Sequence, residues 1–327
     1  LAGYAGVTMP LSEKVRFIPG IRVEYNRMKL QTEGSIFKKG VDNPITSILP
    51  FANLSYNLNT SSLMRLAYSR TINRPEFREL APFSFYDFDL QLDISGNEKL
   101  QIADIHNVDL RWEYYPTPSE FISVGLFYKH FKNPIETIII TGADNAILMY
   151  DNAKKADNAG MEVEIRKSLS YTSSSQVLNN LSVIFNAAYI LSQIQLNNDG
   201  TLLEKEKRPM QGQSPYVINA GLYYQDEEKG LQISTLYNVF GKRIFFVGNL
   251  EFPTVWEMPR HVIDLTISKR ISPKAEIRLG ANDLLNSKAT LKEDANLDNN
   301  VSEKATNKLV RNTRNGQYFT VGVAFKF

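Results

Sequence analysis

Residues 104–115 read DIHNVDLRWEYY, and their alternation is the pattern that decides the fold. The even positions carry rings and aliphatic groups: His106, Val108, Leu110, Trp112 and Tyr114. The odd positions carry polar and charged groups: Asn107, Asp109, Arg111 and Glu113. Because successive side chains of a β-strand point to opposite faces, this stretch predicts a strand with one apolar and one polar face.

Similar alternation recurs along the chain and indicates about thirteen long strand candidates. They cover residues 1–9, 12–28, 45–58, 61–73, 104–115, 119–132, 156–169, 178–195, 211–225, 230–245, 259–270, 274–283 and 316–327. Most are longer than the usual strand of about five or six residues. They reach the roughly nine to eleven residues that a tilted strand needs to cross a bilayer.

The connections between these strands decide between a water-soluble β-sandwich and a membrane barrel, because both would alternate. Short turns alternate with long connections, and the long ones are residues 29–44, 74–103, 133–155, 196–210, 246–258 and 284–315. Outer-membrane barrels have short turns in the periplasm and long loops outside the cell. If the last strand ends in the periplasm, every connection obeys this rule. The sequence therefore predicts an all-β protein, an antiparallel transmembrane β-barrel in the bacterial outer membrane.

The odd number of strand candidates needs an explanation, since bacterial barrels made of one chain have even numbers of strands. One alternative is an additional hairpin within residues 134–152. The other is that further strands precede this chain. The first ten residues, LAGYAGVTMP, contain no initiator Met, basic segment or cleavage motif, which favours the second alternative.

The composition excludes several other classes of protein. The 37 basic and 35 acidic residues give a net charge of +2, too small an excess to indicate a nucleic-acid partner. The absence of cysteine excludes disulfides and thiolate sites. No apolar run approaches the roughly 18 residues of a transmembrane helix. His106, His130 and His261 are too far apart in sequence to indicate a metal site, so we predict neither a metal nor another cofactor.

No motif in the sequence indicates an enzyme. The patterns G-x-S-x-G, H-E-x-x-H and the phosphate-binding loop are absent. Glu162 and Glu164 share one strand face, as the paired carboxylates of a glycosidase could. Arg166 lies on the same face, so we interpret the three residues as a charge network in a wet barrel lumen.

Several local stretches resemble the C-terminal barrel of TonB-dependent outer-membrane receptors. They are NRPEFRELAPFSFYDF (73–88), GNEKL (96–100), HNVDLRWEYYP (106–116), FYKHFKNPIE (127–136), RPMQGQSPYVINAGLYY (208–224) and GKRIFFVG (241–248). The resemblance runs across nearly the whole chain in the same order. It implies a barrel of about 22 strands that is filled by an N-terminal plug domain. Residues 1–327 would then form the C-terminal part of the barrel, with the plug and the first strands outside this chain.

The resemblance also implies a function and a set of partners. The function is TonB-dependent, energised uptake of a scarce nutrient such as a siderophore, cobalamin, an oligosaccharide or a peptide. The partners are outer-membrane lipid, TonB through the plug, the barrel-assembly machinery and, in some receptors, a surface lipoprotein. A passive porin, or a barrel component of a secretion or adhesion complex, is the alternative hypothesis. A soluble β-rich binding protein is a third one.

The long connection at residues 74–103 is the first candidate for ligand contact, because it combines aromatic rings with charges of both signs. Its candidate residues are Arg74, Arg78, Phe83, Phe85, Tyr86, Asp87, Phe88 and Asp89. Rings in an external loop either stack on a ligand or pack on neighbouring loops. The sequence leaves these two roles open for the four aromatic residues.

Aromatic residues near the ends of predicted strands are expected to form the girdles that lie at the level of the lipid headgroups. They are Tyr114, Tyr115, Phe121, Tyr223, Tyr224, Phe245, Phe246 and Trp256. Stacking on a ligand is the alternative.

The last strand also carries an assembly signal. Thr320, Gly322, Phe325 and Phe327 fit the spacing of the C-terminal motif by which the barrel-assembly machinery is thought to select its clients. In that strand, the odd positions from Phe319 to Phe327 are expected to face lipid and the even positions to face the lumen.

Overall fold

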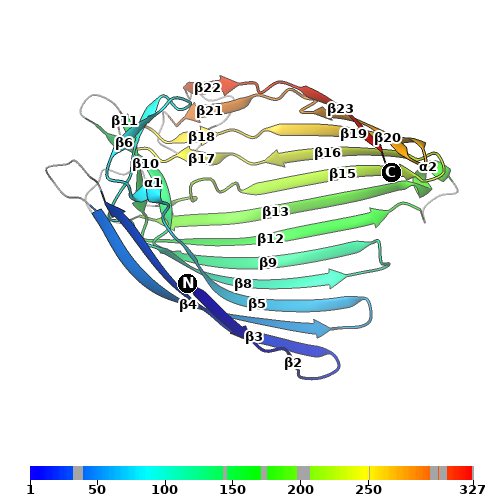
Figure 1. Ribbon diagram of the computed structural model, residues 1–327, viewed down its shortest axis with the longest axis horizontal. Helices are drawn as coiled ribbons and strands as arrows, with labels where there is room; N and C mark the ends of the chain where they lie inside the picture. The colour runs from blue at the N-terminus through cyan, green and yellow to red at the C-terminus, as the bar shows by residue number, and fades with distance from the viewer. Residues whose placement is uncertain are drawn as a thin grey trace.

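The computed structural model describes residues 1–31, 40–142, 146–170, 175–196, 207–249, 251–294, 301 and 308–325. Its main feature is a curved antiparallel sheet in which thirteen strands follow one another (Figure 1). They are β1 (Ala2–Gly6), β3 (Val15–Gln31), β4 (Gly40–Asn57), β5 (Ser62–Asn73), β8 (Ala103–Tyr114), β9 (Phe121–Lys132), β12 (Lys155–Ser168), β13 (Leu181–Gln195), β15 (Tyr216–Asp226), β16 (Leu231–Phe240), β19 (His261–Ser272), β20 (Ala275–Asn282) and β23 (Tyr318–Phe325). The predicted set of thirteen long strands is confirmed.

Two short strands extend this main sheet: β2 (Met9–Pro10) pairs with β3, and β14 (Lys207–Arg208) pairs with β13. Among the described residues β1 and β23 have no pairing with each other, so the sheet is open. No helix of the described residues is long and apolar enough to cross a membrane. The all-β prediction is confirmed.

The connections are sorted by length between the two ends of the sheet (Figure 1). Short turns lie at one end, together with the one-turn helix α2 (Gln176–Asn179). The long connections lie at the other end, where they form the smaller strands and α1 (Phe77–Leu80). This arrangement confirms the predicted alternation of turns and loops.

The cross-strand register places large apolar side chains in one continuous row on one face of the sheet. The row crosses five strands and contains Leu66, Leu110, Leu126, Met161 and Tyr189. These side chains are 38–56% exposed. So large an exposed apolar surface would be unfavourable in water, but it is favourable against the hydrocarbon chains of a bilayer. We therefore assign this face to lipid and call it the outward face.

The opposite face carries a polar row in the same register. It crosses six strands and contains Glu113, Ser123, Glu164, Asn186, Asn219 and Asn238. Polar lumens and apolar exteriors are what outer-membrane barrels have. We call this face the lumen wall.

The last described strand, β23, follows the predicted parity. Phe319, Val321, Val323 and Phe325 continue the outward face across β20 and are 56–76% exposed. Thr320 and Gly322 lie at the other parity. Phe327 is outside the described residues.

Two expectations about strands need correction. The predicted strand at residues 230–245 is interrupted, because β16 ends at Phe240 and β17 (Arg243–Phe246) belongs to a different sheet. The hairpin considered within residues 134–152 exists as β10 (Ile135–Thr141) and β11 (Ala146–Asn152). It pairs with β7 outside the main sheet, so it adds no strand to the wall.

The two faces predict opposite responses to the same charged side chain. Leu126 faces outward, whereas its neighbour Gly125 faces the lumen wall, where an added Cβ would come no closer than 3.9 Å to other atoms. We expect Leu126→Arg to lower the free energy of unfolding in lipid vesicles by about 2–4 kcal/mol, the cost of a cation at mid-bilayer. The matched control Gly125→Arg should cost much less. Equal losses would contradict the assignment of the faces.

Candidate functional site

The long connections fold into a separate structure above one end of the main sheet (Figure 1). One four-stranded sheet has the order β10, β11, β7 (Leu92–Ser95) and β6 (Ser84–Asp87). A second has the order β17, β18 (Val255–Glu257), β21 (Ala289–Glu293) and β22 (Leu309–Thr313). We call the described residues of 74–102, 133–154, 241–260 and 283–317 the cap.

Backbone contacts and apolar cores join the two sheets of the cap. Ile139 N donates to Val247 O at 2.7 Å, and Val247 N donates to Thr137 O at 3.3 Å. Ile94, Ile139 and Leu148 form a buried cluster to which both sheets contribute partly buried rings. A second buried cluster consists of Ile244, Val247, Trp256, Met258 and Val301. The cap is therefore packed from four connections that are distant in sequence.

A third cluster attaches the cap to the wall. Leu80 of α1 and Leu100 pack with Met28 of β3, and Tyr150 of β11 lies against them. Burial raises the pKa of Tyr150 and also that of the Glu79 carboxyl in α1, since both groups are partly desolvated at this junction.

A buried ion pair fixes the cap to the segment after β13. The Arg208 Nη1 and Nη2 atoms lie 3.1 and 2.7 Å from the two carboxylate oxygens of Glu136, and both side chains are at most 4% exposed. Gln211 N donates to the same carboxylate at 2.7 Å. Its side-chain amide accepts from Thr137 N at 2.6 Å and donates to Phe245 O at 2.6 Å. The stretch RPMQ at residues 208–211 thus ties together three connections.

Half of the predicted ligand-contact residues make contacts within the protein. Arg74 pairs with Glu24 of β3, outside the connection. The Arg78 guanidinium lies 3.6 Å from the ring centroid of Phe85, and Phe85 packs against the buried Ile94 cluster. Asp87 accepts hydrogen bonds at 3.0 Å from the backbone N–H groups of residues 89 and 90 and shapes the turn.

Three predicted rings remain available to a ligand. Phe83, Tyr86 and Phe88 are 54%, 48% and 85% exposed, and the last two meet edge to face at 5.1 Å. The Asp89 carbonyl accepts a hydrogen bond from Arg311 Nη1 at 2.9 Å, which links this hairpin to β22. The structure therefore divides the candidate loop into a packed base and an exposed aromatic tip.

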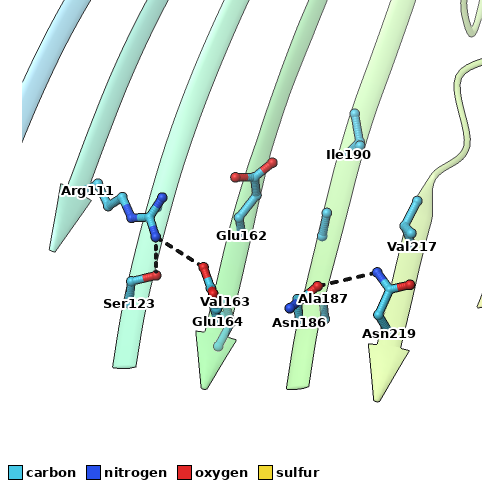
Figure 2. A pocket seen from close by; sticks show the side chains of 12 residues that line it. Arg111, Ser123, Glu162, Val163, Glu164, Asn186, Ala187, Ile190, Val217 and Asn219 are labelled. Atoms are coloured by element: carbon cyan, nitrogen blue, oxygen red, sulfur yellow. Dashed lines mark hydrogen bonds and ion pairs between the residues drawn. The ribbon is translucent and has the colours of Figure 1, made fainter. Parts of the chain in front are cut away.

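The lumen wall is hollowed where β8, β9, β12, β13 and β15 cross its middle, and the hollow has a volume of about 440 Å³ (Figure 2). Arg111 reaches across it and donates to Ser123 Oγ at 3.0 Å and to Glu164 Oε2 at 3.2 Å. Glu113 joins Arg111 to Arg65, which donates to its carboxylate at 3.0 Å. The result is a chain of charges along the wall.

An amide ladder continues this network on the other side of the hollow. Asn238 Nδ2 donates to Asn219 Oδ1 at 2.6 Å, and Asn219 Nδ2 donates to Asn186 Oδ1 at 3.4 Å. Glu162 extends into the hollow (Figure 2) and has no hydrogen-bond or ion-pair partner among the described residues. The predicted network of Glu162, Glu164 and Arg166 is therefore wrong in its members: Glu164 belongs to a charge network on the lumen wall, but its partner is Arg111.

Most of the predicted girdle residues lie elsewhere. Tyr114 and Tyr224 face outward, as expected, whereas Tyr115, Phe121 and Tyr223 have the lumen-facing parity. The remaining three, Phe245, Phe246 and Trp256, belong to the cap, and Trp256 is only 3% exposed. A position near a strand end was therefore insufficient to predict a girdle residue. The parity of the residue and the change of sheet after residue 240 determine which face or sheet each ring occupies.

No group of three or more His, Asp or Glu side chains among the described residues is arranged to hold a metal ion. The site is instead a packed cap with an exposed aromatic tip above a polar wall. An antiparallel sheet with an apolar exterior, a polar interior, turns at one end and long loops at the other is the wall of an outer-membrane β-barrel.

The chain belongs to the outer membrane protein beta-barrel family, whose model matches residues 1–319. Its place is accordingly the bacterial outer membrane. No curated protein sequence matches the chain.

Several solved structures share the fold. The ferric enterobactin receptor of Pseudomonas aeruginosa is 17% identical, with a TM-score of 0.62 over 99% of this chain and 45% of that chain. The copper transporter OprC is 16% identical, with a TM-score of 0.66 over 100% of this chain and 49% of that one. The ferric yersiniabactin uptake receptor of Yersinia pestis is 14% identical, with a TM-score of 0.66 over 100% and 45%. The chain thus spans less than half the length of these structures.

The buried ion pair predicts how the cap can be loosened without changing the wall. Glu136→Ala leaves the Arg208 charge buried without its partner, which costs about 3–5 kcal/mol in a folded protein. We expect amide hydrogen exchange in β10 and β11 to accelerate while exchange in β8 and β9 stays unchanged. Glu276→Ala, which removes an exposed pair with Arg278, is the control and should change little.

The double variant Glu136→Leu/Arg208→Met should restore most of the protection, since no buried charge remains. Unaltered exchange in Glu136→Ala would show that the ion pair does not hold the cap.

Proposed function

We propose that this chain forms part of the barrel and the external cap of a receptor that takes up a scarce nutrient across the outer membrane with energy supplied through TonB. The observation that carries the proposal is the cap itself. Four connections pack into one structure above a polar lumen wall, and this structure presents exposed rings. A scaffold of this kind suits ligand capture, because binding residues on ordered loops are held in place by the elements beneath them.

The shared fold supports this class of function. The solved structures that resemble the chain are described as a ferric enterobactin receptor, a copper transporter and a ferric yersiniabactin uptake receptor. The chain covers 45–49% of their lengths. We propose that the full-length protein completes a barrel of about 22 strands and includes a plug that contacts TonB. A siderophore, cobalamin, an oligosaccharide or a peptide remains the proposed class of ligand.

Within the cap, the exposed rings of Phe83, Tyr86 and Phe88 are the proposed ligand contact, with Tyr86 and Phe88 together at the tip. Rings of this kind supply large contact area with few rotatable bonds, and they dominate binding energy in many interfaces. Arg74, Arg78, Phe85 and Asp87 have supporting roles, since their side chains are engaged in the contacts that shape the hairpin.

The last strand has a separate proposed role in assembly. Thr320, Gly322 and Phe325, together with Phe327, form the motif that the barrel-assembly machinery would recognise. The position of β23 at the edge of the described sheet, with apolar residues at alternate positions, supports this role, because an unpaired strand edge is a template for pairing with another chain.

The aromatic tip can be tested by comparing two exposed rings of the same connection in the full-length receptor. Phe88 lies in the tip and Phe77 lies in α1, and they are 85% and 59% exposed. We expect Phe88→Ala to weaken ligand binding to cells about tenfold, which is typical of losing an aromatic anchor. Phe77→Ala should bind like the parent. Identical affinities for the parent and Phe88→Ala would remove the tip from the binding site.

Energised transport has a different readout. Cells that lack TonB, or whose proton gradient is collapsed, should bind the ligand at their surface but should not accumulate it. The control is the same strain with TonB restored. Accumulation that continues without TonB and rises in proportion to external concentration would indicate a passive pore.

A further inference from the structure

The outward face changes character near the cap ends of β5, β8, β9 and β12. The row above Leu66 and Leu110 contains Tyr68, Val108 and Tyr128. Polar residues occupy the next row at this end: Arg70, His106, His130 and Asp157. The row after it contains Ile72 on β5, followed by Asp104, Lys132 and Lys155. We call Arg70, Asp104, Lys132 and Lys155 the rim patch.

Two tyrosines mark the depth of the rim patch in the membrane. The Tyr68 hydroxyl lies 2.9 Å from His106 Nδ1, and the Tyr128 hydroxyl donates to Asp157 Oδ1 at 2.6 Å. Tyrosine rings with an apolar body and a hydrogen-bonded tip settle at the boundary between acyl chains and headgroups. The rim patch, one to two rows closer to the cap, is therefore level with the headgroups of the outer leaflet.

The carboxylates of this region are already engaged. Arg70 binds Asp104 through two contacts of 2.8 and 2.6 Å, and His130 Nδ1 lies 2.7 Å from Asp157 Oδ1. Lys132 and Lys155 have no ion pair among the described residues, and both are exposed.

These two lysines are also direct cross-strand partners. Side chains in such a pair have Cβ atoms only about 4.5–5.5 Å apart, and like charges at this position are destabilising. A negatively charged group bound between the two ammonium groups would replace their repulsion with two attractive contacts. Both side chains lie on the outward face, so such an anion would approach from the outward side.

We propose that Lys132 and Lys155 bind the phosphate groups of lipids in the outer leaflet. The patch faces outward, directly above the apolar rows that contact acyl chains, so a lipid can place its tail and its phosphate on the wall at once. Lysine is a good point-charge ligand for phosphate, and basic residues at an anionic membrane surface contribute additively to lipid attraction. Free phosphate would gain only the second of these two contacts.

The test uses the full-length protein in detergent micelles and measures binding of lipid A that carries both phosphates, with dephosphorylated lipid A and inorganic phosphate as further probes. We expect Lys132→Ala/Lys155→Ala to weaken binding of the phosphorylated lipid at least tenfold. The control Lys129→Ala/Lys14→Ala also removes two charges, from the lumen parity of β9 and from a turn at the opposite end, and should bind like the parent.

Retained heat-dependent gel mobility would show that each variant still folds as a barrel. Equal binding of phosphorylated lipid A by the parent and Lys132→Ala/Lys155→Ala would overturn the proposal. So would equal binding of dephosphorylated lipid A, because phosphate would then contribute nothing. Lysine-dependent binding of inorganic phosphate as tight as that of the lipid would assign the patch to free anions and would also overturn it.

Discussion

The structure depends on one constraint, which is that backbone N–H and C=O groups in hydrocarbon need partners within the protein. Antiparallel pairing between successive strands meets this need for the interior of the sheet, from β3 to β20. Once pairing is fixed, the period of two assigns every side chain to lipid or to lumen. If β8 slipped by one residue against both of its neighbours, Leu110 would move to the lumen and Arg111 would be exposed to lipid.

The wall in turn determines what the cap can be. Loops that leave adjacent strands emerge about 5 Å apart, the spacing of paired strands, so long connections are forced into contact. The chain uses that proximity to build two small sheets and to bury the Arg208–Glu136 pair. The pair is costly to bury, yet both of its carboxylate oxygens have donors, which is the condition under which such pairs persist. The cap consequently holds Tyr86 and Phe88 together at one exposed tip.

The parts of the fold that depend on local pattern could be predicted from the sequence, whereas those that depend on distant contacts could not. Alternation and loop length gave the thirteen strands and both faces of β8 and β23. The strand predicted at residues 230–245 crossed the change from β16 to β17, because the pairing of Arg243 with Glu257 in a second sheet is a contact between distant segments.

The candidate site shows the same limit. Composition drew attention to residues 74–103, but separating the packed Phe85 from the exposed Phe88 requires knowing that Ile94, Ile139 and Leu148 meet beneath them. Parity does place Arg111 on the same face as its strand neighbour Glu113. The register across β9 was the missing information, since it brings Glu164 within reach of that guanidinium.

The charged residues of this chain lie in three environments. Each environment determines differently how a charge is compensated. On the lumen wall, water and neighbouring dipoles support Glu162 without a partner. In the cap, where water is excluded, Glu136 needs a bidentate partner and a backbone donor. At the outer rim, Lys132 and Lys155 lie beside each other, and neither has an ion pair among the described residues. The two lysines are exposed and lie directly opposite each other, so the rule for buried charges does not apply to them. In our proposal, the phosphate of an outer-leaflet lipid supplies the negative charge between them.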